Sequence, residues 1–154
     1  EPAKVMKHVN WYAQYFSAVT GRKAAPEDLI TMSEAVYNFQ RIFNLRMGFG
    51  RRQHDILPYR AMGPVTEEEY QSRQERYDAQ LEERHGVDPE GKQTGEKVAL
   101  LRRFREEAYE KLKDAVYARR GWTAEGIPTL ATARRLGIDF PEVVELLKAK
   151  GVVE

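Results

Sequence analysis

Residues 26–47, PEDLITMSEAVYNFQRIFNLRM, carry the helical pattern from which the rest of the fold can be predicted. Its start favours a helix N-terminus, because Pro26 has a backbone angle suited to a first turn and two acids follow it at the positive end of the helix dipole. Its apolar residues recur at spacings of three and four, as on one face of an α-helix: Leu29, Met32, Val36, Phe39 and Phe43. The stretch predicts a central helix whose apolar stripe packs against a partner.

Helical patterns continue on both sides of this stretch. Residues 3–19 have the same apolar spacing and end before Gly21, a residue typical of helix ends. Two short helices are predicted in the tail, with Thr129 and Gly137 bounding the first and Asp139, Pro141 and Gly151 bounding the second. Since no alternating run of useful length occurs, we expect an all-α fold without a sheet of more than two short strands.

Residues 66–113 differ in composition, because 23 of these 48 residues are charged, 13 acids and 10 bases. Thr66 and Glu69 have the spacing of a capping box at the start of one helix, and a second helix is predicted over 94–119. The apolar positions are Tyr70, Tyr77 and Leu81 in the first helix, and Val98, Leu101, Ala108, Leu112 and Ala115 in the second. Two charged helices joined by a short turn predict an antiparallel hairpin over 66–119.

The length of 154 residues suits one domain. We expect a single helical domain over residues 1–154, with a core formed by 1–60 and 120–154 and the hairpin 66–119 as an excursion. Because the sequence begins with Glu1 rather than with a methionine, we expect a piece cut from a longer chain.

Composition excludes several classes of protein. The chain is 42% hydrophobic and 32% charged, which is apolar enough for a core and argues against wholesale disorder. It has no cysteine, so a disulfide scaffold, a zinc–cysteine site, a cysteine nucleophile and an iron–sulfur cluster held by this chain alone are excluded. No apolar run is long enough to span a membrane and no secretory signal is present, so we expect a cytoplasmic protein.

One segment carries a local excess of positive charge. It contains one acid, Asp55, and five arginines, Arg41, Arg46, Arg51, Arg52 and Arg60. Arginine presents a planar fork of donors that matches phosphate or carboxylate, so one interpretation is an anion site for a phosphorylated cofactor or substrate. The alternative is that these arginines pair with acids or with carbonyl groups at helix ends. The net charge of +1 argues against a nucleic-acid partner.

The histidines and tryptophans give weaker signals. His54 lies beside Asp55, and such a pair could orient a proton donor, although a packing role is the simpler interpretation. His8 and His85 are expected on helices without a special role, and three scattered histidines predict no metal site. Trp11 and Trp122 are expected in a core or an interface. We assign no catalytic residue and no metal ligand within the chain.

The order and spacing of several motifs resemble a known family. The motifs are Arg41-Ile42-Phe43-Asn44-Leu45-Arg46-Met47-Gly48-Phe49, Arg52, Asp55, Leu57-Pro58 and Arg60, then Arg119-Arg120-Gly121-Trp122 and Gly126-Ile127-Pro128-Thr129. They are similar to the C-terminal domain of the aldehyde ferredoxin oxidoreductase family of tungsten enzymes. The chain departs from the family pattern where Gln53-His54-Asp55 stands in place of two acids. The resemblance implies a tungsten bis-pyranopterin and one 4Fe-4S cluster, with ligands mostly outside this chain.

The charged hairpin is similar to that of a particular branch of this family. Gly63-Pro64-Val65-Thr66 and Val87-Asp88-Pro89 resemble the branch that contains the tungsten subunit of class II benzoyl-CoA reductase. That branch implies anaerobic aromatic degradation, in which benzoyl-CoA is reduced to a cyclic dienoyl-CoA. The alternatives are oxidation of aldehydes to carboxylic acids, and a helical module that docks a partner subunit without contacting a ligand.

The resemblance also implies partners and a role for the arginine segment. The partners would be the remaining domains of the same chain, an iron–sulfur electron-transfer subunit, and an acyl-CoA or aldehyde substrate. Surfaces that face missing domains should expose apolar side chains, and the isolated chain should be inactive. The residues expected to line the cofactor site or substrate channel are Arg46, Arg51, Arg52, His54 and Arg60.

Overall fold

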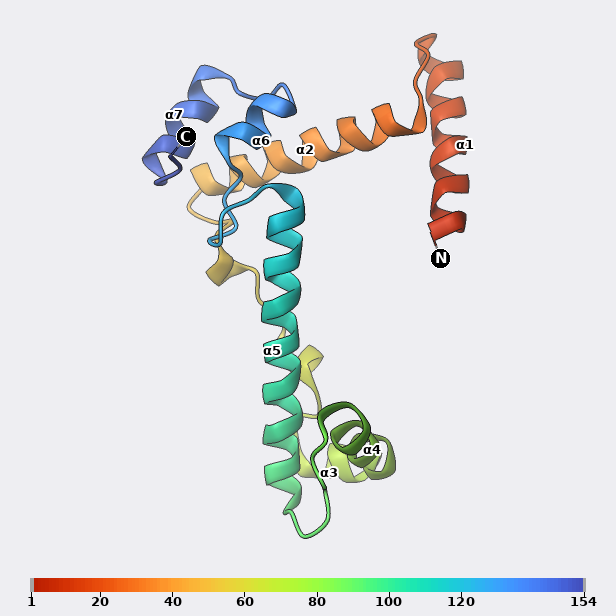
Figure 1. Ribbon diagram of the computed structural model, residues 1–154, viewed down its shortest axis with the longest axis vertical. Helices are drawn as coiled ribbons and strands as arrows, with labels where there is room; N and C mark the ends of the chain where they lie inside the picture. Colours follow the sequence, from red (N-terminus) through yellow and green to blue (C-terminus); the bar gives the residue numbers. More distant parts are fainter. Residues whose placement is uncertain (1, 154) are drawn as a thin grey trace. The chain divides into compact units, whose positions relative to one another are not determined.

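The computed structural model describes residues 2–153, with side chains from residue 5 onward, and the described part is all-α, as predicted (Figure 1). The α-helices are α1 (Pro2–Thr20), α2 (Pro26–Arg46), α3 (Glu67–Gln71), α4 (Gln74–His85), α5 (Thr94–Arg120), α6 (Leu130–Arg135) and α7 (Pro141–Ala149), and two 3₁₀-helices are η1 (Arg52–His54) and η2 (Tyr59–Met62). An isolated antiparallel bridge joins Trp122 and Pro128. None of the described helices is both long and apolar enough to cross a membrane.

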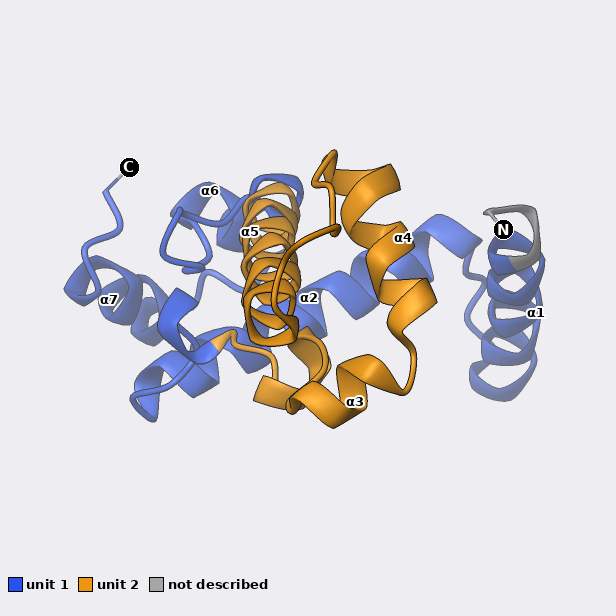
Figure 2. Ribbon diagram, turned by 90° about the horizontal axis from the view of Figure 1, so that it is seen from below, with its two compact units in different colours: residues 1–54, 118–154 blue, residues 55–117 orange. Residues whose placement is uncertain are grey.

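The chain forms two compact units (Figure 2). Unit 1 comprises Glu1–His54 and Ala118–Glu154, and unit 2 comprises Asp55–Tyr117. The boundary falls within α5, whose last turn belongs to unit 1. Each unit has a hydrophobic cluster of its own.

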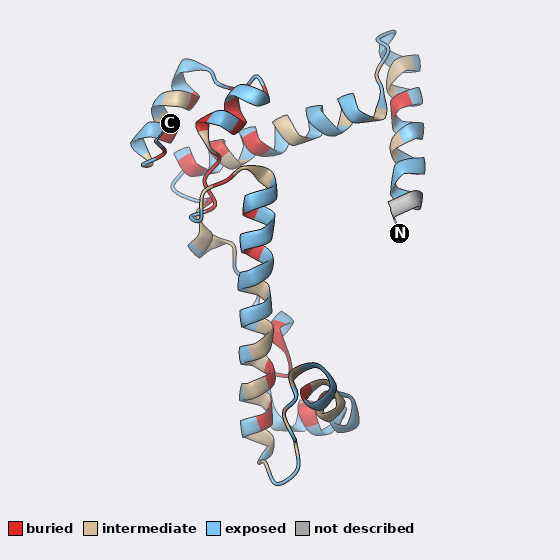
Figure 3. Ribbon diagram, viewed as in Figure 1, coloured by how far each residue is buried: buried red, intermediate tan, exposed pale blue. Residues whose placement is uncertain are grey.

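The core of unit 1 lies where α2, α6 and α7 meet. Its buried residues are Ile42, Leu45, Ile127, Leu130, Ala133, Leu136, Ile138, Val143, Leu147 and Val152. The burial map shows these positions concentrated near the C-terminal half of α2 (Figure 3). Helix α1 contacts α2 as well, so α2 has neighbours at both of its ends.

The buried face of α2 differs from the predicted one. Ala35, Asn38, Ile42 and Leu45 face the core, whereas the predicted stripe is largely exposed, with Val36 at 68%. Both sets satisfy helical spacing, because α2 has apolar residues on two faces. Periodicity reveals such faces but does not decide which one α6 and α7 cover.

The ends of the short helices follow local capping chemistry. The Thr129 hydroxyl accepts a 3.2 Å hydrogen bond from the Thr132 N–H and caps α6, as predicted. The N-cap of α7 is Phe140, not Asp139, and no side chain caps this end. Pro141 occupies the first turn and lacks an N–H, so one of the backbone donors that have no partner within the helix is absent there.

The first arm of the hairpin in unit 2 is broken into two helices rather than continuous. The chain leaves helical geometry at Arg73 (φ −139°, ψ 32°), between α3 and α4. The rings of Tyr70 and Tyr77 are therefore 5.1 Å apart, whereas a rise of about 1.5 Å per residue would separate them by about 10 Å along one helix. The break allows both tyrosines to pack in the same small core with Leu81 and Leu101.

Two further details of unit 2 differ from the predictions. Thr66 accepts a hydrogen bond from the Glu69 N–H, but the Glu69 carboxylate accepts from the Val65 N–H, so the capping box is only half formed. On α5, Leu101 is buried, whereas Leu112 is 57% exposed. Ala108 and Ala115 are exposed too, because the small core of unit 2 covers only the first part of this long helix.

A charged group is buried beside this core. The Lys97 ammonium lies 3.1 Å from both carboxylate oxygens of Asp78, and the Tyr70 hydroxyl donates to the same carboxylate at 2.7 Å. Burial opposes ionisation of Asp78, but the hydrogen bonds from Tyr70, Lys97 and Gln74 lower its pKa below the usual range. Burial, followed by the neighbouring carboxylate, raises the pKa of Tyr70. The group is thus a charged pair with a neutral tyrosine.

Candidate functional site

The candidate site is the arginine bend, which we define as residues 41–54 together with the turn 121–128, all in unit 1. Helix α2 ends at Arg46, and the chain turns through Gly48 and Gly50, both with positive φ. A Cβ atom on Gly50 would lie 3.3 Å from the Arg41 carbonyl oxygen. The glycine therefore allows the backbone to pack closely against α2, so this close approach serves the fold rather than a ligand.

Two of the predicted arginines hold the turn 121–128. The Arg41 Nε donates to the Gly126 carbonyl at 3.0 Å, and its guanidinium lies 4.8 Å from the Trp122 ring centre. The Arg52 Nη1 donates to the Ala124 carbonyl at 3.1 Å, while the Arg52 N–H donates to the Glu125 carbonyl at 2.9 Å. Both arginines thus donate to backbone carbonyl groups of this turn, which are not at the end of a helix.

A stacked aromatic pair, formed by buried Trp122 and exposed Tyr37, supports the bend. Trp122 is stacked on Tyr37, with ring centres 6.0 Å apart and planes at 9°, and its indole N–H donates to Asn38 at 2.7 Å. The Arg120 guanidinium covers the Tyr37 ring at 4.1 Å. Sequence reasoning placed Trp122 in a core or interface but missed Asn38, whose only signal was a polar residue between apolar positions of a helix.

Arg46 and Arg51 differ from the other arginines. Among the described residues, neither guanidinium has a hydrogen-bond or ion-pair partner. Arg51 is half-buried and Arg46 is exposed at the end of α2. The Arg51 backbone N–H donates to His54 Nδ1 at 3.2 Å, and the His54 ring meets the Phe49 ring edge to face with centres 5.6 Å apart. His54 therefore shapes the bend.

Arg60 is not part of this bend. It belongs to unit 2, is largely exposed, and pairs with Glu69 at 3.0 Å. Asp55 also belongs to unit 2 and accepts a 2.5 Å hydrogen bond from the Tyr117 hydroxyl. The predicted segment is thus divided between the two units: Arg41, Arg51, Arg52 and His54 belong to unit 1, and Arg60 belongs to unit 2.

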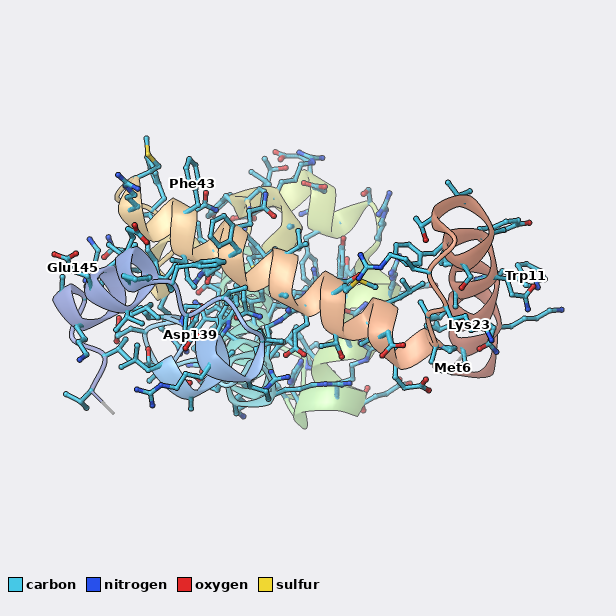
Figure 4. All side chains as sticks on the ribbon, turned by 90° about the horizontal axis from the view of Figure 1, so that it is seen from above. Met6, Trp11, Lys23, Phe43, Asp139 and Glu145 are labelled. Atoms are coloured by element: carbon cyan, nitrogen blue, oxygen red, sulfur yellow. The ribbon has the colours of Figure 1, made fainter. Side chains whose placement is uncertain are left out.

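The remaining candidates have packing roles or lie at the surface. His85 stacks on Phe104 with ring centres 4.0 Å apart, and His8 is tilted against Trp11 at 5.6 Å. Trp11 is 46% exposed and projects away from α1, as Phe43 does from α2 (Figure 4). Within residues 2–153, no group of three or more histidines, aspartates or glutamates could hold a metal ion. The residues described here do not fit a tungsten or iron–sulfur centre.

Comparison with known proteins identifies the region that this chain represents. A family model described as "Aldehyde ferredoxin oxidoreductase, domains 2 & 3" matches residues 2–138. No curated protein and no solved structure matches the chain. The matched residues include the whole arginine bend and all of unit 2, and they stop before α7. The match covers well over half of the residues of this chain. The chain therefore belongs to the aldehyde ferredoxin oxidoreductase family.

Proposed function

We propose that this chain is the C-terminal helical domain of a tungsten–pterin oxidoreductase, in which units 1 and 2 form one domain of a longer chain. The observation that carries the proposal is the family match over residues 2–138. The bound cofactor would supply the electron-transfer chemistry, and residues outside this chain would hold the metal and the cluster. This domain would then form one wall of the active site and contact anionic groups of the cofactor or substrate.

Within the family, we propose that the parent enzyme is the active-site subunit of a class II benzoyl-CoA reductase. Unit 1 carries 14 bases against 9 acids, whereas unit 2 carries 11 bases against 15 acids. A CoA thioester bears several phosphate charges and a simple aldehyde bears none. A basic unit with two arginines that lack partners among the described residues therefore suits an acyl-CoA better than an aldehyde.

The test uses the full-length protein purified without air. Metal analysis should find tungsten and iron, and the protein should consume benzoyl-CoA when a strong reductant supplies electrons. Activity with aldehydes but not with benzoyl-CoA would instead establish the aldehyde-oxidising alternative. A fully folded protein without tungsten would contradict both. The 154-residue chain alone should be inactive, because its described residues form no metal site.

A second candidate function, subunit or domain docking, is favoured by an apolar groove between α1 and α2. The groove measures about 640 Å³ and is lined by Val9, Tyr12, Phe16, Leu29, Ile30, Met32, Ser33, Val36, Tyr37 and Gln40. Tyr12 is 65% exposed in it and Val36 is 68% exposed. Exposed apolar surface of this kind marks an interface. Co-purification of the full-length Val36→Asp variant with its electron-transfer subunit would test this role, with the exposed α1 change Gln14→Asp as the control.

A further inference from the structure

We infer that Arg51 contacts a phosphate group together with Arg46, which precedes it by five residues, and that His54 and Arg52 are positioning residues that fix Arg51. The inference rests on the proposed function, which supplies two sources of that phosphate: the pterin cofactor and the CoA thioester. Four arginines were expected to line the cofactor site or substrate channel, and the inference keeps two of them, Arg46 and Arg51. Arg52 and Arg60 leave the set because each is already paired.

The backbone around Arg51 is fixed by contacts at Arg51 itself and at the residues before and after it. Its own N–H donates to His54 Nδ1 at 3.2 Å. The next residue, Arg52, is tied through its N–H and its guanidinium to the carbonyl groups of Glu125 and Ala124. The preceding residue, Gly50, is buried against α2. An anion-binding side chain is most effective on a backbone fixed in advance, because less ordering is required when the ligand binds.

The Arg51 guanidinium has an unmatched charge. The side chain is half-buried and has no hydrogen-bond or ion-pair partner among the described residues. Residues 35–54 contain no acid, and the next acid along the chain, Asp55, accepts a hydrogen bond from the Tyr117 hydroxyl. A partly desolvated guanidinium attracts an anion more strongly than an exposed one, because less water screens the charge. Its planar fork also fits two oxygens of one phosphate.

The neighbouring side chains suggest an organic phosphate. Phe49 lies between two glycines and two residues before Arg51, and it is 62% exposed. One of its contacts is the His54 ring, at 5.6 Å. An exposed aromatic ring beside a cation suits a ligand that joins a flat ring to phosphate groups. The adenine nucleotide of CoA and the pterin phosphate both have this chemistry, and experiment distinguishes them.

The experiment compares Arg51→Gln with Arg60→Gln in the full-length protein. Both changes remove one arginine charge, but Arg60 is an exposed residue of unit 2 paired with Glu69. The readouts are binding of free CoA by calorimetry, tungsten content by metal analysis, and the melting temperature. If Arg51 contacts CoA, Arg51→Gln weakens CoA binding roughly 10- to 100-fold and leaves tungsten content unchanged. If Arg51 contacts the pterin, tungsten content falls instead.

Conservative variants separate contact from structure. Arg51→Lys keeps the charge and should retain part of the lost affinity or loading. His54→Asn should behave like the wild type, because its side-chain oxygen accepts the Arg51 N–H, whereas His54→Phe should reproduce the Arg51→Gln defect with little change in melting temperature.

The inference is overturned if the Arg51→Gln variant binds CoA as tightly as the Arg60→Gln variant and contains as much tungsten. A lowered melting temperature without a change in either readout also overturns it, because Arg51 is then structural. A wild-type protein that contains no tungsten and binds no CoA contradicts the proposed function itself, whatever the variants do.

Discussion

The indole N–H of Trp122 donates a 2.7 Å hydrogen bond to the side-chain oxygen of Asn38, and both residues are buried. The bond joins two segments that lie 84 positions apart in the sequence. The Asn38 side-chain N–H₂ donates to the Glu34 carbonyl at 2.9 Å, so its amide is paired at both ends. Asn38 thus links the middle of α2 to the turn that follows α5.

Replacing Asn38 by leucine should lower the free energy of unfolding by about 2 kcal/mol, because the buried indole N–H loses its acceptor. Urea denaturation of the 154-residue chain, followed by circular dichroism, measures the change. The same substitution at Asn10, an exposed residue of α1, is the matched control and should have little effect. Equal stabilities for the two variants would show that the hydrogen bond contributes nothing.

Asp78→Asn should destabilise unit 2 by about 3 kcal/mol, since it leaves the largely buried Lys97 ammonium without its counter-charge. Urea denaturation again measures the effect. The reference is Glu107→Gln, which breaks the exposed ion pair with Arg103 and should change stability by less than about 1 kcal/mol. If Asp78→Asn lowers the free energy of unfolding no more than Glu107→Gln does, the buried ion pair contributes no more to stability than the exposed one, contrary to this prediction.

The same carboxylate should make stability depend on pH. The folded state lowers the pKa of Asp78, so the unfolded chain binds this proton at higher pH than the folded chain does. The stabilisation is therefore complete well above the unfolded pKa of about 3.9, and it is lost as the pH falls through the lower folded pKa. Thermal melts from pH 7 down to pH 3 should show a smaller acid-induced loss for Asp78→Asn than for the wild type. Parallel curves would contradict this.

Gly121→Ala should be more harmful than Gly137→Ala, although both glycines have positive φ, 67° and 65°. A Cβ atom at Gly121 would collide with the Thr132 hydroxyl, whereas one at Gly137 would meet no atom within 4 Å. The change at Gly137 should cost about 1 kcal/mol through backbone strain alone, and the change at Gly121 should cost at least about 1 kcal/mol more. Melting temperatures of the two variants test the order.

Leu147→Ala tests whether α7, which lies beyond the residues matched by the family model, is part of the core. Leu147 is fully buried among residues of α2 and α6, so its truncation should cost about 2–5 kcal/mol. Leu112→Ala, at a 57% exposed position of α5, is the control and should cost less than about 1 kcal/mol. Similar losses of unfolding free energy in the two variants would mean that α7 is not part of the core.

Local patterns were enough to predict the helices and many of their ends. The spacing of Leu29, Met32 and Val36 indicated a helix, and Thr129 and Gly137 bounded α6 as expected. Such signals succeed because hydrogen bonds within a few residues, and the backbone angles that glycine and proline allow, decide where a helix begins and ends. The order of short motifs likewise predicted the family, which the match over residues 2–138 confirms.

Tertiary structure alone decided which face of each helix is covered and which arginines have partners. Val36 and Ile42 both fit an apolar helix face, yet only Ile42 is buried, because α6 and α7 pack on that side. Arg51 and Arg52 are neighbours with the same side chain, yet only Arg52 reaches the carbonyl of Ala124, 72 residues away. Sequence determines which groups can donate, accept or bury surface. The partner of each group depends on contacts between distant segments, which form only when the chain folds.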